Sequence, residues 1–238
     1  MSSARLTLIF VLSLPFWSIA QSIPPAPDHH YNEAGFFDIH VCHWPDRPVF
    51  FMALFSTTRF KEVREVAVSD PAGHQIGKLD LTKYNIVQAK DKPEKRVFIS
   101  HLNIPTGSPN GWHEARITLN DGKILTAKDF VRIDKMPLPQ GFKPEDGDEV
   151  SEIPTALSWN TVPGAKFYRV FIKNLWTGET VHQSKVLSEP RVALPPELLQ
   201  RGETYSWKVH ARDVNEDPLW GDFNLGTLSR DLVFSIAP

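Results

Sequence analysis

Residues 204–212 read Thr-Tyr-Ser-Trp-Lys-Val-His-Ala-Arg, and this short stretch decides the class of fold. Every second residue in it is apolar. Successive side chains of a β-strand point to opposite faces, so this period of two predicts a half-buried strand. The side chains expected to face the core are Tyr205, Trp207, Val209 and Ala211. Those expected to face water are Ser206, Lys208, His210 and Arg212.

Strand-like segments separated by turns fill most of the remaining chain. Its 238 residues include 20 prolines and 13 glycines, with 41% hydrophobic and 11% aromatic residues. Such a pattern is typical of all-β proteins and favours two tandem immunoglobulin-like β-sandwiches. Asn120-Asp121-Gly122 is expected to close a hairpin, because Asp-Gly tolerates positive φ. The other expected strands cover residues 36–41, 49–55, 63–68, 97–102, 115–119, 124–133, 157–159, 167–172, 180–186, 191–194 and 228–236.

A stretch without apolar periodicity, residues 136–152, separates two blocks of strands. It holds three prolines, two glycines and five acidic residues. This composition predicts an acidic linker between domains. We therefore expect one sandwich with an extended N-terminal lead-in over residues 21–135, and a second sandwich over residues 153–238.

The second block carries the more specific pattern. Leu157-Ser158-Trp159, Val162-Pro163-Gly164-Ala165 and Tyr168-Arg169-Val170 follow one another, and residues 199–205 lead into the alternating strand. Over about residues 150–238 this pattern resembles a fibronectin type III domain. The resemblance implies that the Tyr205 ring packs in the core and that its hydroxyl group bonds to the preceding crossover. It also implies a binding or spacing role, usually without catalysis.

The first 20 residues predict a cleavable secretory signal peptide. Residues 1–5 carry one positive charge, residues 6–20 are mainly apolar, and Ser18-Ile19-Ala20 places small residues where a signal peptidase cuts. We expect cleavage after Ala20 and a secreted or periplasmic protein without a transmembrane segment in the mature chain. An uncleaved membrane anchor is the alternative.

Charge and cysteine content exclude some partners and crosslinks. The chain has 26 basic and 28 acidic residues, a net charge of −2, which gives no electrostatic footprint for nucleic acid or anionic lipid. Cys42 is the single cysteine, so no intrachain disulfide can form. No Asn-x-Ser/Thr sequon is present, which favours a bacterial envelope as the setting.

Residues 213–227, the expected connection between the last two strands, are rich in acidic and aromatic side chains. Long loops in compact domains are often functional. Three interpretations remain open. Trp220 and Phe223 pack against the first domain, or they bind a partner together with Asp213 and Asp222, or the carboxylates bind calcium. The calcium interpretation rests on residues 213–218, which are similar to the calcium linker motif of cadherins.

Trp176 is a second candidate for partner binding. It precedes the Thr177-Gly178 turn, so its side chain is expected near a rim of the second sandwich. An exposed aromatic side chain there would anchor a protein partner or stack on a sugar ring. The alternative is that Trp176 caps one end of the core.

His40, Cys42 and His43 are the candidate metal ligands, because imidazole and thiolate groups bind copper or zinc. No second pair follows at zinc-finger spacing. The alternative is a buried cysteine with histidines at the end of a strand.

Motifs for catalysis are missing from the sequence. It contains no Gly-x-Ser-x-Gly, no phosphate-binding loop and no His-Glu-x-x-His. We therefore expect no enzyme, but an exported binding or scaffold protein that contacts another protein in a periplasmic or extracellular assembly. The alternatives are a periplasmic copper- or zinc-binding protein and a carbohydrate-binding accessory protein.

Overall fold

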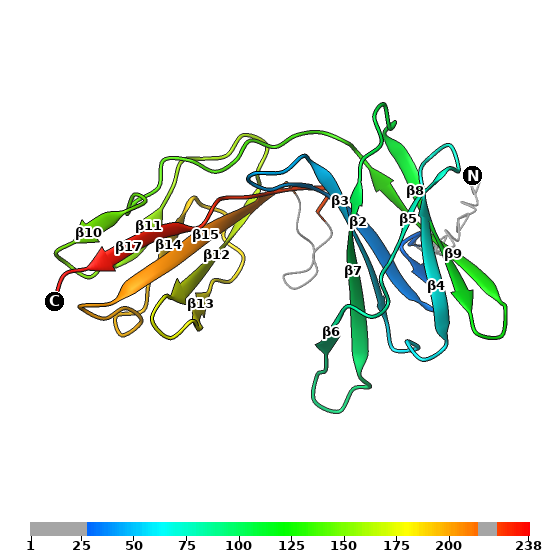
Figure 1. Ribbon diagram of the computed structural model, residues 1–238, viewed down its shortest axis with the longest axis horizontal. Coiled ribbons are helices and arrows are strands. Elements are labelled where there is room, and N and C mark those ends of the chain that lie inside the picture. The colour runs from blue at the N-terminus through cyan, green and yellow to red at the C-terminus, as the bar shows by residue number, and fades with distance from the viewer. Residues whose placement is uncertain (1–27, 214–222) are drawn as a thin grey trace, which may run out of the picture.

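The computed structural model describes residues 28–213 and 223–238, and Figure 1 shows their arrangement. In this part of the chain the regular secondary structure is entirely β, with seventeen strands. The described residues contain no helix that is long and apolar enough to cross a membrane. The predicted signal peptide and its cleavage site after Ala20 lie outside the described residues.

The N-terminal half consists of two facing sheets (Figure 1). The first contains β1 (Tyr31–Asn32), β2 (Gly35–His43), β3 (Phe50–Thr57), β7 (Lys95–Asn103) and β6 (Tyr84–Val87). The second contains β5 (Gln75–Lys78), β4 (Val63–Ser69), β8 (Gly111–Leu119) and β9 (Ile124–Val131). Apolar side chains from both sheets form the core between them, among them Phe37, Ile39, Val41, Phe51, Val66, Ile117 and Ala127. The predicted all-β sandwich class is confirmed.

The hairpin between β8 and β9 forms where the Asp-Gly turn predicts it. Thr118 pairs with Ile124 across the turn, and the Gly122 N–H donates to the Leu119 carbonyl at 3.0 Å. Gly122 has φ +88°, a left-handed conformation that glycine adopts without the steric cost of a Cβ atom.

The C-terminal half is built around β15 (Thr204–Arg212), the strand in which every second residue is apolar. Its sheet also contains β12 (Phe167–Asn174), β13 (Thr180–Gln183), β16 (Leu225–Leu228), β17 (Leu232–Ile236) and β10 (Asp148–Val150). A separate pair is formed by β11 (Ala156–Ser158) and β14 (Arg191–Ala193). Tyr205 is buried and its hydroxyl oxygen accepts a hydrogen bond from the Gln200 N–H at 2.9 Å, as the fibronectin type III resemblance implies.

The two halves share one continuous sheet, which was not expected from the sequence. Strand β16 pairs with β15 on one edge and runs parallel to β2 on the other, with Leu225 opposite Val41 and Thr227 opposite His43. The hydrogen-bonded order is therefore β10-β17-β15-β16-β2-β3-β7-β6. The boundaries at residues 135 and 153 stay predictions.

Two sequence expectations about this region were wrong. The end of the expected loop at 213–227 belongs to β16, because residues 225–227 pair with residues 41–43 of β2, far away in the sequence. Among the side chains that were expected to face water, Ser206 is 7% exposed, and so is Arg212. Its outer face is covered by Phe223, over whose ring the guanidinium carbon lies at 4.6 Å.

Candidate functional site

Backbone and side-chain hydrogen bonds fasten the two halves together at β16. The Val41 N–H donates to the Asn224 carbonyl at 2.8 Å. The Asn224 side chain both accepts from the Arg132 N–H, at 2.7 Å, and donates to the Arg132 carbonyl, at 2.8 Å. The Thr227 hydroxyl donates to the His43 carbonyl at 3.1 Å. Hydrogen bonds therefore hold the pairing of β16 with β2 at both of its ends, at Asn224 and at Thr227.

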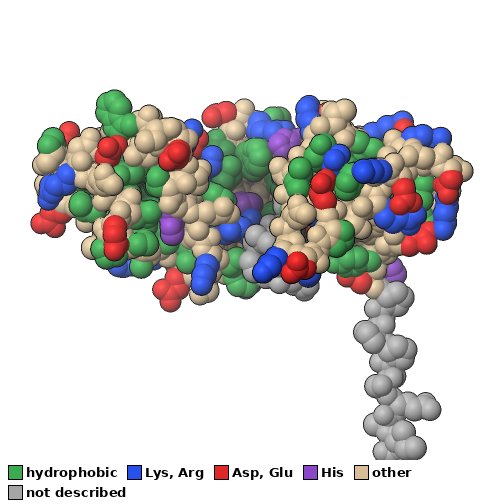
Figure 2. Space-filling view, turned by 90° about the horizontal axis from the view of Figure 1, so that it is seen from below, with side chains coloured by type: hydrophobic (Ala, Val, Ile, Leu, Met, Phe, Trp, Pro, Cys, Tyr) green, Lys and Arg blue, Asp and Glu red, His purple; other side chains and the backbone are tan. Residues whose placement is uncertain are grey.

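An aromatic and cationic cluster, here called the junction cluster, lies beside this strand pair and comprises His40, His210, Arg212 and Phe223. The Phe223 ring is 2% exposed and stacks on His40, with ring centroids 3.7 Å apart. Its other neighbours are His210, edge-on at 5.4 Å, and Arg212. In Figure 2 the surface is hollowed where the halves meet, and histidine side chains are visible in the recess.

Burial controls the charge state of the junction cluster. Burial, with the nearby Arg212 charge, lowers the pKa of His210 well below its usual value, so this imidazole is neutral at pH 7. Its Nδ1 accepts a hydrogen bond from Arg212 Nε at 3.3 Å. Burial likewise lowers the pKa of Arg212 to about 10, which leaves the guanidinium charged at pH 7. The cluster therefore holds a buried cation over an aromatic ring.

Gly226 allows this packing. A Cβ atom at this position would lie 2.4 Å from Phe223 Cε2 and 2.8 Å from His210 Nε2, closer than real side chains approach. The absence of a side chain at Gly226 therefore leaves the space that the Phe223 ring and the His210 imidazole occupy.

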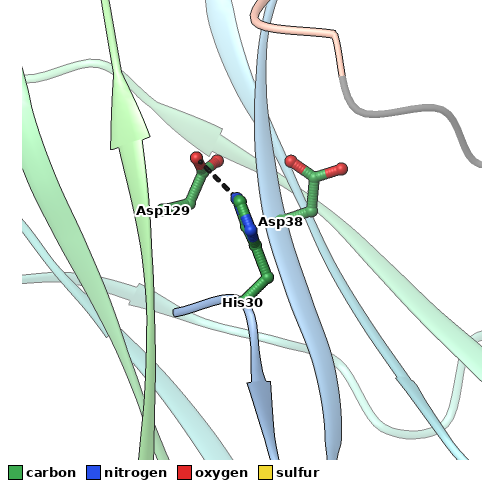
Figure 3. A group of neighbouring side chains, drawn as sticks. All are labelled: His30, Asp38 and Asp129. Atoms are coloured by element: carbon green, nitrogen blue, oxygen red, sulfur yellow. Dashed lines mark hydrogen bonds and ion pairs between the residues drawn. The ribbon is translucent and has the colours of Figure 1, made fainter. Parts of the chain in front are cut away.

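A second group of polar side chains, the His30 cluster, comprises His30, Asp38 and Asp129 (Figure 3). These residues come from the lead-in, β2 and β9, and one potential ligand atom of each lies within 4.8 Å of the others. His30 Nε2 is 3.1 Å from Asp129 Oδ1. Asp38 is 1% exposed and Asp129 is 7% exposed, so both carboxylates lie largely away from water.

The His30 cluster occupies a gap on the outer edge of β2. The Phe37 N–H donates to the His30 carbonyl and the Val41 N–H donates to the Asn224 carbonyl. Between them, the Ile39 N–H donates to Asp129 Oδ2 at 2.8 Å. Asp129 therefore replaces a strand partner at the position between β1 and β16 where backbone pairing stops.

The pKa values of two members of the His30 cluster are both raised, but for different reasons. The hydrogen bond to Asp129 raises the pKa of His30 to about 9, although burial opposes the shift. Burial raises the pKa of Asp38, although the contact with His40, whose Nε2 lies 2.8 Å from Asp38 Oδ2, opposes it. Asp38 thus connects the His30 cluster to the junction cluster.

The structure places the predicted partner-binding residues in different environments. Phe223 and Asp213 are buried at the junction, where Asp213 Oδ1 accepts from the Leu225 N–H at 2.8 Å. This position of Phe223 matches the interpretation in which it packs against the first half. Trp220 and Asp222 lie outside the described residues. Trp176, in contrast, is 72% exposed.

The predicted metal ligands His40, Cys42 and His43 are not brought together as one ligand set among the described residues. His40 faces Asp38, and the Nδ1 atom of His43 lies 2.8 Å from the Met136 carbonyl oxygen. Cys42 is buried, and burial raises the pKa of its thiol to about 12. A thiol in this state is neutral, whereas a metal needs the thiolate.

Sequence reasoning missed Asp38 and Asp129. Asp38 stands between Phe37 and Ile39 in an apolar stretch, and Asp129 takes the buried position between Ala127 and Val131 in the alternation of β9. A carboxylate at an inward position of a strand is the signal that would have indicated a polar site.

The turn that carries Trp176 is held by a network of hydrogen bonds. Asn174 Oδ1 accepts from the Trp176 and Thr177 N–H groups at 2.8 and 3.1 Å. The Leu175 N–H donates to the Thr204 carbonyl at 2.9 Å. The large side chains at the tip are nevertheless exposed, Leu175 at 45% and Trp176 at 72%. A fixed backbone thus presents two apolar side chains to solvent.

Comparison of the sequence with protein-family models and with curated proteins found no match. Among solved structures, the chain is similar to the FN1–FN3 domains of chicken CNTN1, with 14% identity and a TM-score of 0.29 over 86% of this chain and 65% of that one. It is also similar to DIP-gamma IG1+IG2, with 11% identity and a TM-score of 0.23 over 84% of this chain and 95% of that one.

A third similar structure is the Bacteroides ovatus mixed-linkage glucan utilization locus protein SGBP-B in complex with a mixed-linkage heptasaccharide. The identity is 13% and the TM-score 0.23, over 82% of this chain and 42% of that one. The chain therefore spans less than half the length of this protein and 65% of the chicken structure. With TM-scores this low, the fold class rests on the strand arrangement described above.

Proposed function

We propose that this chain is an exported, non-catalytic binding and scaffold protein that holds a partner protein through the turn at Leu175 and Trp176. The observation that carries the proposal is the 72% exposure of Trp176 on a hydrogen-bonded turn. Tryptophan is enriched among the side chains that dominate binding energy at protein interfaces. An exposed tryptophan on a rigid turn loses little conformational freedom when it binds.

The junction supports the scaffold part of the proposal. Because β16 belongs to a sheet that continues through both halves, movement of one half against the other would break strand pairing. The burial of Phe223 adds packing at the same place. A rigid connection between the halves suits a scaffold protein, because it fixes the distance between a partner bound at the Trp176 turn and the N-terminal half.

Replacement of Trp176 by alanine tests the function. The tagged chain and the variant are expressed in the native host, crosslinked in the envelope, and compared for the proteins recovered. We expect recovery of a defined partner to fall at least about 10-fold, the effect of losing about 1.4 kcal/mol of binding free energy. The free energy of unfolding is expected to change by less than about 0.5 kcal/mol, because the side chain is exposed.

Trp112→Ala is the matched control, because Trp112 is also exposed, at 45%, but lies on β8 in the other half. It is expected to leave recovery of the partner unchanged. Equal recovery with all three chains would refute the role of Trp176. Loss with Trp112→Ala alone would move the partner surface to the N-terminal half.

A further inference from the structure

Each member of the His30 cluster has one polar atom held by a partner outside the proposed ligand set, while His30 Nε2 and Asp129 Oδ1 face each other within the cluster. His30 Nδ1 is 2.7 Å from Asp28 Oδ1, and Asp129 Oδ2 accepts from the Ile39 N–H. Asp38 Oδ2 is bound to His40 Nε2. Metal-binding histidines and carboxylates are oriented in this way by outer partners on the atom that does not touch the metal.

The charge around the cluster favours a cation. Three carboxylates, Asp28, Asp38 and Asp129, surround His30, and two of them are largely buried. Both imidazole nitrogens of His30 face carboxylate oxygens, so both carry protons and the ring itself is the positive charge at the site. Buried carboxylates are stable only when they are paired with protons, cations or metal ions.

We propose that the His30 cluster binds a divalent transition-metal ion of the zinc type through His30 Nε2 and one carboxylate oxygen each of Asp38 and Asp129. The His30–Asp129 separation of 3.1 Å is close to the about 3.4 Å between neighbouring ligands of a tetrahedral zinc ion. Asp38 has to move slightly inward, since the three ligand atoms span up to 4.8 Å. The ion replaces the proton between His30 Nε2 and Asp129.

The ligand set selects the class of metal. One imidazole nitrogen with two carboxylate oxygens suits zinc and its neighbours in the first transition row. Calcium prefers six to eight oxygen ligands, and copper(I) prefers sulfur, which the cluster does not offer. With three protein ligands, the fourth position of the ion is left for water.

The bound ion adds a link between three segments that already share hydrogen bonds, among them those from the Lys128 N–H to the His29 carbonyl and from the Ile39 N–H to Asp129 Oδ2. His30 belongs to the lead-in, Asp38 to β2 and Asp129 to β9. Through Asp38 and its contact with His40, the ion also fixes one wall of the junction cluster. The site lies away from the Trp176 turn, so its failure would leave the proposed partner binding untouched.

The test uses the full chain with a C-terminal tag that contains no histidine. Zinc is titrated against a chromophoric chelator, and thermal unfolding is measured with and without one equivalent of zinc. We expect one zinc ion per chain and a higher melting temperature. Magnesium at the same concentration is expected to leave the melting temperature unchanged, because it binds imidazole poorly.

Substitutions locate the ion. His30→Gln and Asp129→Asn are each expected to weaken zinc binding at least about 100-fold, and Asp28→Asn, which removes only an outer partner, about 10- to 100-fold. The amide introduced by Asp129→Asn still offers an oxygen to the Ile39 N–H, and Asp28 is exposed, so these variants are expected to fold. The controls are His29→Gln, beside the site, and Cys42→Ser.

Several results would overturn the proposal. One is the absence of a zinc-dependent shift in melting temperature together with binding weaker than the chelator detects. Another is unchanged binding in His30→Gln and Asp129→Asn. Loss of binding in Cys42→Ser alone would move the metal to the set predicted from the sequence.

Discussion

Replacing Phe223 by alanine is expected to lower the free energy of unfolding by about 3–5 kcal/mol, the usual cost of removing a buried phenylalanine side chain. The ring is 2% exposed and stacks on His40 at 3.7 Å between ring centroids. Its loss leaves a cavity beside the Arg212 guanidinium, which then has no aromatic face to cover it. Urea unfolding followed by tryptophan fluorescence measures the change.

Hydrogen exchange locates the part of the structure that Phe223→Ala destabilises. The Val41 N–H, which bonds to the Asn224 carbonyl, is expected to exchange faster than in the unmodified chain, because it lies on the shared edge of β2. Phe130→Ala is the control, since Phe130 is 53% exposed on β9. A loss of stability below about 1 kcal/mol, with unchanged exchange at Val41, would show that Phe223 does not hold the junction.

The Cys42 thiol is expected to react with iodoacetamide at pH 8 at least about 1,000-fold more slowly than an exposed cysteine. Only the thiolate reacts, and burial raises the pKa of Cys42 from 9.0 to about 12. At pH 8 the thiolate fraction falls from about 10% to about 0.01% with this shift, because each pKa unit is a factor of ten. Burial of the sulfur slows the reaction further.

The comparison needs an exposed cysteine in the same protein. Lys92→Cys in a Cys42→Ser background provides one, because Lys92 lies in an exposed turn. Mass spectrometry follows alkylation of both chains, in buffer and in urea. The two cysteines are expected to react alike once the chain is unfolded. Native rates within about tenfold of each other would contradict the burial of Cys42.

Local sequence patterns predicted the positions of the strands better than the contacts between segments that are distant in the sequence. The alternation in residues 204–212 places Tyr205 and Trp207 in the core, where the structure has them. The same pattern assigned Arg212 to water, which is wrong. Alternation reports which residues are apolar, whereas the cover over Arg212 comes from Phe223, a residue outside this strand. No periodicity within one strand contains that information.

The candidate sites show the same limit. The metal hypothesis for His40, Cys42 and His43 relied on residues that are close together in the sequence. Asp129 lies 99 residues from His30 and reaches it only because β9 passes the open edge of β2. Trp176 was found from the sequence because its position before a Thr-Gly turn is a local property.

The pairing of β16 with β2 also sets an order of events during synthesis. Thr227 and His43, which bond across this pair, are 184 residues apart. The edge of β2 at residues 41–43 therefore waits unpaired until almost the whole chain has been made. An exposed strand edge of this kind is a template for association with other chains. A strand made near the beginning of synthesis thus receives its edge partner from residues made near the end.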